Sequence, residues 1–188
     1  RLMTIFEFLV AFAAILAGLG ATRLLHAFPY VFNKDRSFWL HQLIFLYTII
    51  NAIGAWWATW SMSKVERWDL LKFASYILYF GVFFLLCDLI APNNSEKIDS
   101  WKDHFFKIRK SFYICNIFLA QIFYLNQTYV LEIDNYEFFV IYLVWTGTSI
   151  LGTISDNYKT QSILVVFTFL YVLILNISTF VMESPMFH

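Results

Sequence analysis

Charged residues are scarce in this chain. Asp, Glu, Lys and Arg make up 14% of its 188 residues and hydrophobic residues 60%, whereas soluble domains carry about 25% charged residues. A soluble domain of this length leaves too much of its chain exposed to conceal so many apolar side chains, so the composition argues against a soluble fold. The 13 basic and 13 acidic residues cancel, which leaves no basic excess for a nucleic-acid partner.

Cysteine and histidine are also few. The two cysteines, Cys87 and Cys115, lie in apolar runs and indicate buried thiols, not a disulfide framework or a metal cluster. Of the four histidines, His26 and His41 fall on the same predicted membrane side. Both are interfacial, so they do not favour haem ligation. No serine, cysteine or acid at membrane depth has a base and an orienting partner beside it. We therefore expect no metal, no cofactor and no enzymatic activity.

Long apolar runs rich in aromatic residues fill the rest of the sequence, which holds 22 Phe, 11 Tyr and 7 Trp. About twenty apolar residues are needed to span a bilayer as a helix. Six segments meet this length: residues 4–26, 40–62, 71–91, 111–130, 136–155 and 162–182. No connecting segment is large enough for a separate domain. The sequence predicts an all-α integral membrane protein, a bundle of about six transmembrane helices in one domain, residues 1–188.

The basic residues predict an orientation. Nine of the 13 Lys and Arg fall in or beside the connecting segments 27–39, 92–110 and 156–161. Positive charge accumulates on the cytoplasmic side of membrane proteins. We expect these three loops to be cytoplasmic and both termini to lie outside.

Small residues recur at helical spacing along the first segment, namely Ala11, Ala14, Gly18 and Ala21. Small side chains allow close approach of helix backbones in lipid. This face predicts close packing and a central place in the bundle for the first helix.

Arg23, Asp88 and Glu7 are ionisable residues within the predicted spans. Arg23 and Asp88 are placed by the topology at the same membrane side, and an ion pair between them would neutralise two costly charges. Glu7 lies near the other end of the first helix. It either reaches its own interface or faces the bundle and lines an outer vestibule.

A polar stripe runs along the fifth segment. Tyr142, Thr146, Ser149 and Thr153 follow steps of four, three and four residues, which places them on one helical face. Hydroxyl groups in hydrocarbon need partners, so this face must meet protein or water. It is either a surface for hydrogen bonding between helices or the lining of a pore. Asn116 and Gln121 in the fourth segment and Asn51 in the second are further route candidates, because a carboxamide both donates and accepts.

Three functions remain open from the sequence. The first is a channel or transporter for a small ion or polar solute, as an oligomer, with the polar stripe in its route. The second is a non-catalytic subunit of a larger respiratory or defence complex. The third is a protein that handles a lipid or quinone. In each case the lipid bilayer is a partner, and either further copies of the chain or other membrane subunits are expected partners.

Overall fold

The computed structural model is all-helical in the part of the chain that it describes, residues 4–133 and 135–183, with residues 179–183 as backbone only. It contains six long helices: α1 (Ile5–Val31), α2 (Trp39–Ala58), α3 (Leu70–Ile90), α4 (Trp101–Leu125), α5 (Tyr136–Ile154) and α6 (Tyr158–Glu183). Three short helical turns join them: η1 (Thr59–Lys64), η2 (Ser95–Lys97) and η3 (Asn126–Val130). Five of the long helices in these ranges are apolar enough to cross a membrane. The predicted multi-pass membrane fold is confirmed.

Local sequence signals set several helix starts. Thr4 and Glu7 form a reciprocal capping box at the start of α1, which satisfies two backbone donors that a helix start leaves open. The side chain of Asp69 accepts from the Lys72 backbone at the start of α3, and Asn135 accepts from the Glu137 backbone at the start of α5. Short polar acceptors are the preferred helix caps. These two helices accordingly begin within one residue of the prediction.

The fourth helix departs furthest from its predicted bounds, whereas the ends of α1 and α2 and the start of α6 differ by four or five residues. It begins at Trp101, ten residues before the predicted start, and the Ser100 side chain caps it by accepting from Asp103. Four large residues at spacings of four, three and four are buried along it: Trp101, Phe105, Ile108 and Phe112. This buried apolar stripe extends the helix toward its N-terminus. The charged residues of this added stretch lower its mean hydropathy below that of a membrane span. The predicted loop 92–110 is therefore mostly helix.

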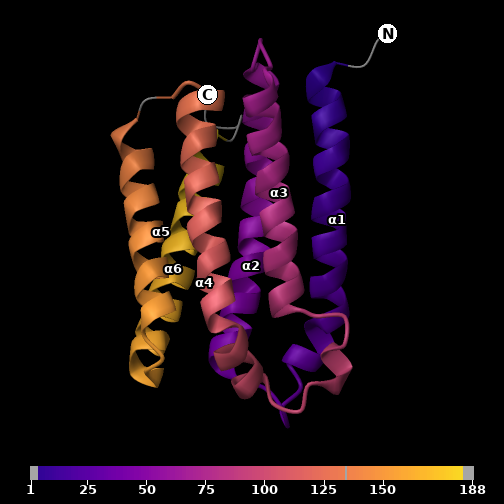
Figure 1. Cartoon of the computed structure of the whole chain (residues 1–188), viewed down its shortest axis with the longest axis vertical. Helices are drawn as coiled ribbons and strands as arrows, with labels where there is room; N and C mark the ends of the chain where they lie inside the picture. The colour runs from indigo at the N-terminus through magenta and orange to yellow at the C-terminus, as the bar shows by residue number, and fades with distance from the viewer. Residues whose placement is uncertain (1–3, 134, 184–188) are drawn as a thin grey trace.

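The six helices form a closed arrangement around a central space. Figure 1 shows α1, α3, α4 and α5 side by side in the front layer, with α2 and α6 behind them. Each of the front helices packs on its neighbour, and α2 packs mainly on α6. Smaller contacts between α1 and α2 and between α5 and α6 complete the ring, and α2 also contacts α3 and α4 across it. We name the two ends of this bundle the η1 end, where α2 ends and α3 begins, and the η2 end.

The two ends differ in how they are packed. Toward the η2 end a large core joins α1, α2, α3 and α4, with Leu40, Phe45, Phe83 and Trp101 nearly or wholly buried. The Trp101 indole also donates to the Tyr30 carbonyl, 2.8 Å away. Toward the η1 end a smaller cluster joins only α1, η1, α3 and η3. The η2 half is a filled core, and the η1 half leaves space between the helices.

Candidate functional site

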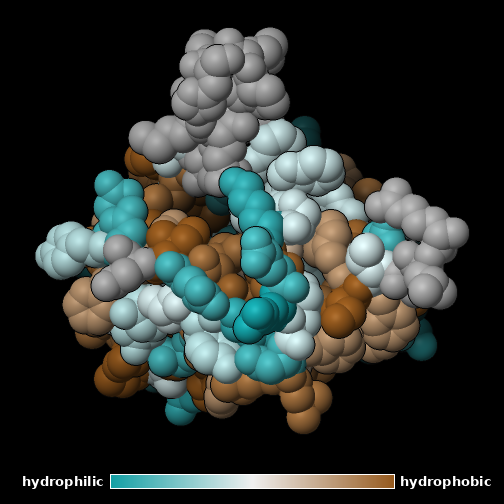
Figure 2. Space-filling view, turned by 90° about the horizontal axis from the view of Figure 1, so that it is seen from above, coloured by the Kyte–Doolittle hydropathy of each residue, from teal (hydrophilic) through white to brown (hydrophobic). Residues whose placement is uncertain are grey.

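The space in the η1 half is a cavity of about 1250 Å³. Its walls come from the middle of α1, the last turns of α2, the start of α3, η3, and the η1 halves of α5 and α6, and most of the lining side chains are apolar. Figure 2, seen from the η1 end, shows a hollow with an apolar interior between hydrophilic residues at its rim. It exceeds the 300–1,000 Å³ of common ligand pockets.

The small-residue face of α1 lies on this cavity. Ala14, Gly18 and Ala21 are among its lining residues, and a Cβ atom added to Gly18 would meet nothing within 4 Å. The prediction that this face packs closely in the centre of the bundle was wrong, because α1 lies at the edge (Figure 1) and packs on α3 through another face. In this structure the small side chains of α1 leave open space in the cavity and do not mediate close helix packing.

A hydrogen-bonded cluster closes the inner end of the cavity. Asn116 Oδ1 accepts from the Tyr47 hydroxyl at 2.5 Å and from Trp145 Nε1 at 3.1 Å, and Asn116 Nδ2 donates to the Phe112 carbonyl at 2.9 Å. Asn116 is 2% exposed, and Trp145 lies in the cavity lining. The cluster joins α2, α4 and α5 where the filled core of the η2 half begins. The cavity therefore ends here as a blind pocket.

The polar stripe of α5 meets α4, not the cavity. Tyr142 donates to Gln121 Oε1 at 3.2 Å, and Gln121 Nε2 donates to Thr146 Oγ1 at 3.4 Å. Ser149 is buried, and Thr153 donates to the Ser149 carbonyl of its own helix at 2.9 Å. None of these five residues lines the cavity. The structure places them at helix–helix contacts and in back-bonding, one of the two alternatives that the stripe left open.

The remaining sequence candidates do not form a single site. Glu7 is exposed, and its carboxylate accepts from the Thr4 backbone at 2.7 Å as part of the α1 cap. Arg23 Nε lies 3.2 Å from Asp88 Oδ1, so the structure brings this pair together between α1 and α3. Asn51 is the only route candidate among the cavity-lining residues of the described chain, and its amide donates to the Tyr47 carbonyl at 3.0 Å.

One buried polar group was missed by the sequence reasoning. Arg109, 5% exposed, donates from α4 to the carbonyls of Gly152 and Ser155 at the end of α5. Gln161 donates to the same two carbonyls and accepts from the Tyr113 hydroxyl at 2.9 Å. A cation is stabilising at a helix C-terminus, where the carbonyls are unpaired. The sequence predicts Arg109 to lie in the loop 92–110. Only the longer α4 of the structure shows that this side chain lies inside the bundle.

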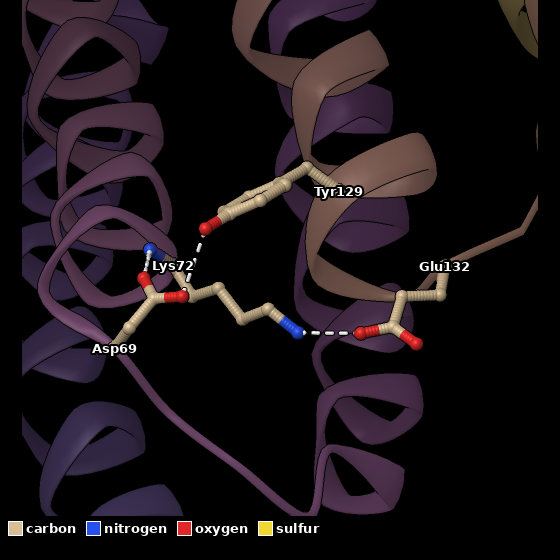
Figure 3. A network of polar contacts seen from close by, with 4 residues as sticks. All are labelled: Asp69, Lys72, Tyr129 and Glu132. Carbon is tan, nitrogen blue, oxygen red and sulfur yellow. Dashed lines mark hydrogen bonds and ion pairs between the residues drawn. The ribbon is translucent and has the colours of Figure 1, made fainter.

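Two contacts tie η3 to the start of α3 (Figure 3). Tyr129 donates to Asp69 Oδ2 at 2.8 Å, and Lys72 Nζ lies 2.8 Å from Glu132 Oε1. Glu132 has a backbone φ of 56°, a left-handed conformation that is uncommon for residues other than glycine. We call these four residues the η3 bracket. It holds the turn after η3 in a conformation that the chain alone disfavours.

The bracket makes the η1 end sensitive to acid. The hydrogen bond and charge of Lys72 lower the pKa of Glu132 below its ordinary 4.5, and the Lys72 backbone amide, followed by Tyr129, lowers the pKa of Asp69 below 3.8. A group whose pKa is lowered on folding contributes stability above its ordinary pKa and loses it as the pH falls through the folded value. The melting-temperature difference between wild type and Glu132→Gln should therefore be constant above pH 4.5 and shrink below it. A difference that persists in acid would contradict the bracket's role.

Comparison of the chain with protein-family models, curated proteins and solved structures finds no match. The function must therefore be argued from the geometry. Within the ranges that the structure describes, no group of three or more His, Cys, Asp or Glu side chains is placed to hold a metal ion. The cavity is the candidate functional site.

Proposed function

We propose that this membrane protein binds an amphiphile with a large apolar part, such as a lipid or a quinone, inside the cavity. The observation that carries the proposal is a blind and mostly apolar cavity inside a membrane bundle. Sites for small ligands are concave and largely apolar, with a few polar groups that fix orientation. Here the polar groups are amides and hydroxyls, among them Asn51, Tyr79 and Asn176.

The arrangement gives less support to a channel. Six of the eight route candidates are engaged at helix–helix contacts or along their own helices, Glu7 caps α1, and Asn51 alone lines the cavity. A continuous route would also have to cross the filled core of the η2 half. Channel or transporter activity, and an oligomer built around it, stay predictions from the sequence. Ion flux from proteoliposomes of the purified chain is the measurement that would support them.

A larger side chain in the cavity should weaken amphiphile binding. In Gly18→Leu the new side chain enters open cavity space, and leucine favours the helix over glycine, so the variant should fold. An octadecyl chain carrying a solvent-sensitive fluorophore would be titrated into purified protein in detergent. We expect the variant to bind this probe about tenfold more weakly than wild type, because the leucine side chain occupies space that the bound chain would fill, and such overfilling costs about 1–3 kcal/mol.

Gly81→Leu is the matched control. It adds the same side chain to a helical glycine that also has open space around it but does not line the cavity. Its affinity for the probe should equal that of wild type. Equal loss in both variants, or no loss in Gly18→Leu, would contradict binding in the cavity.

A further inference from the structure

The turn η3 at the end of α4 is a π-helix, and it changes which side chains face the cavity. The Leu131 amide donates to the Asn126 carbonyl five residues earlier at 3.0 Å, and the Ile133 amide donates to the Gln127 carbonyl at 3.0 Å. Single π-helical turns are rare and are found frequently at functional sites. Here the turn places two consecutive carboxamides, Asn126 and Gln127, among the cavity-lining residues.

The two carboxamides differ in their partners. Asn126 Oδ1 accepts from the Ser75 hydroxyl at 2.9 Å, which ties it to α3. Gln127 is only 9% exposed and lines the cavity, yet no hydrogen bond to its side-chain amide is present among the described residues. Its amide atoms are not among the fully buried side-chain atoms without a partner, so they border the cavity and lose water only when a ligand fills it, which is costly for an amide without a partner. A polar group of a bound ligand would remove this cost.

The surroundings of Gln127 define the chemistry of that polar group. A carboxamide is uncharged and both donates and accepts hydrogen bonds. Of the cavity-lining residues in the described ranges, the one with a charge is Glu137, in the first turn of α5 at the η1 end. A charged group bound beside Gln127 would be desolvated without a counter-ion, which is strongly unfavourable. A hydroxyl or carbonyl group fits.

We propose that Gln127 anchors the amphiphile by hydrogen bonding an uncharged hydroxyl or carbonyl group, a proposal that rests on the cavity binding proposed above. The η3 bracket fixes the anchor, because Tyr129 within the π-helical turn and Glu132 just after it are both tied to the start of α3 (Figure 3). A pre-organised polar group costs less to order when the ligand binds.

Three ligands that share one eighteen-carbon chain test the anchor. Oleyl alcohol carries a hydroxyl, 9-octadecene carries no polar group, and oleate in alkaline buffer carries a charge. Each would displace the fluorescent octadecyl probe from wild type, Gln127→Leu and Gln121→Leu. Gln121 is the matched control, because it is a glutamine of α4, the helix that η3 continues, and lies outside the cavity lining.

We expect wild type to bind the alcohol more tightly than the alkene or oleate. In Gln127→Leu the affinity for the alcohol should fall about tenfold, the loss of one hydrogen bond in an apolar site, while the alkene binds unchanged. Gln121→Leu should match wild type for all three ligands.

Two results would overturn the anchor while leaving cavity binding intact. One is an alcohol affinity that Gln127→Leu leaves unchanged although Gly18→Leu lowers it. The other is oleate binding more tightly than the alcohol in wild type, which would indicate a charged headgroup. Absence of binding by all three ligands and by the probe would instead contradict the cavity proposal on which the anchor rests.

Discussion

Gly152→Ala should prevent the chain from accumulating as a folded protein. A Cβ atom at Gly152 would overlap three atoms of the Tyr113 ring. The ring has no room to retreat, because its hydroxyl donates to Gln161, and Gln161 is itself fixed on the Gly152 and Ser155 carbonyls. Alanine improves helix propensity over glycine by only about 1 kcal/mol. Overpacking of this rigid kind costs about 3 kcal/mol or more.

The measurement is the yield of monodisperse protein in detergent and its melting temperature. Gly147→Ala serves as the control, since the same change on the same helix would meet nothing within 4 Å. It should be as stable as wild type or slightly more stable. If Gly152→Ala behaved like Gly147→Ala, the close α4–α5 contact at Tyr113 would be wrong.

Asn116→Leu should cost about 2 to 4 kcal/mol of stability, because two donors lose their acceptor at once. The Tyr47 hydroxyl and the Trp145 indole both donate to Asn116 Oδ1 in the interior of the bundle. Leucine has the same branched shape, although its two methyl groups make it larger, and it accepts no hydrogen bond. The loss would appear as a lower melting temperature in detergent and as greater sensitivity to denaturing surfactant.

A double-mutant cycle isolates the cause of that loss. Tyr47→Phe removes one of the stranded donors, so Asn116→Leu should cost less in the Tyr47→Phe background than in wild type. Strict additivity of the two changes would show that the pair does not interact. It would leave Asn116 free for the transport role that the sequence suggested.

The helical fold follows from the sequence because each element is encoded locally. Apolar runs of span length and short polar caps such as Asp69 and Asn135 predict the helices with little reference to tertiary structure. The start of α4 was missed for the same reason. Its charged residues suggested a loop, whereas the buried stripe from Trp101 to Phe112 becomes decisive only once α1, α2 and α3 surround it.

The site was less predictable because it depends on which helix faces contact one another in the bundle. Periodicity placed Tyr142 and Thr146 on one face of α5, but a stripe of hydroxyls looks the same whether it faces water or Gln121. The small residues of α1 likewise gave no sign that the facing space is open. Gln127 is distinguished by its place in a π-helical turn and by a side-chain amide without a hydrogen-bond partner. Neither property can be predicted from sequence periodicity.

The pairing of α2 with α6 bears on how the protein is made. The second helix leaves the ribosome well before α6, its main packing partner. Until α6 arrives, the α2 end of the future cavity, including Gly54 with its close contact to Asn176, stays open to lipid. The cavity is therefore completed only after α6 has been synthesised. A nascent chain stalled before α6 would lack the α6 wall of this cavity.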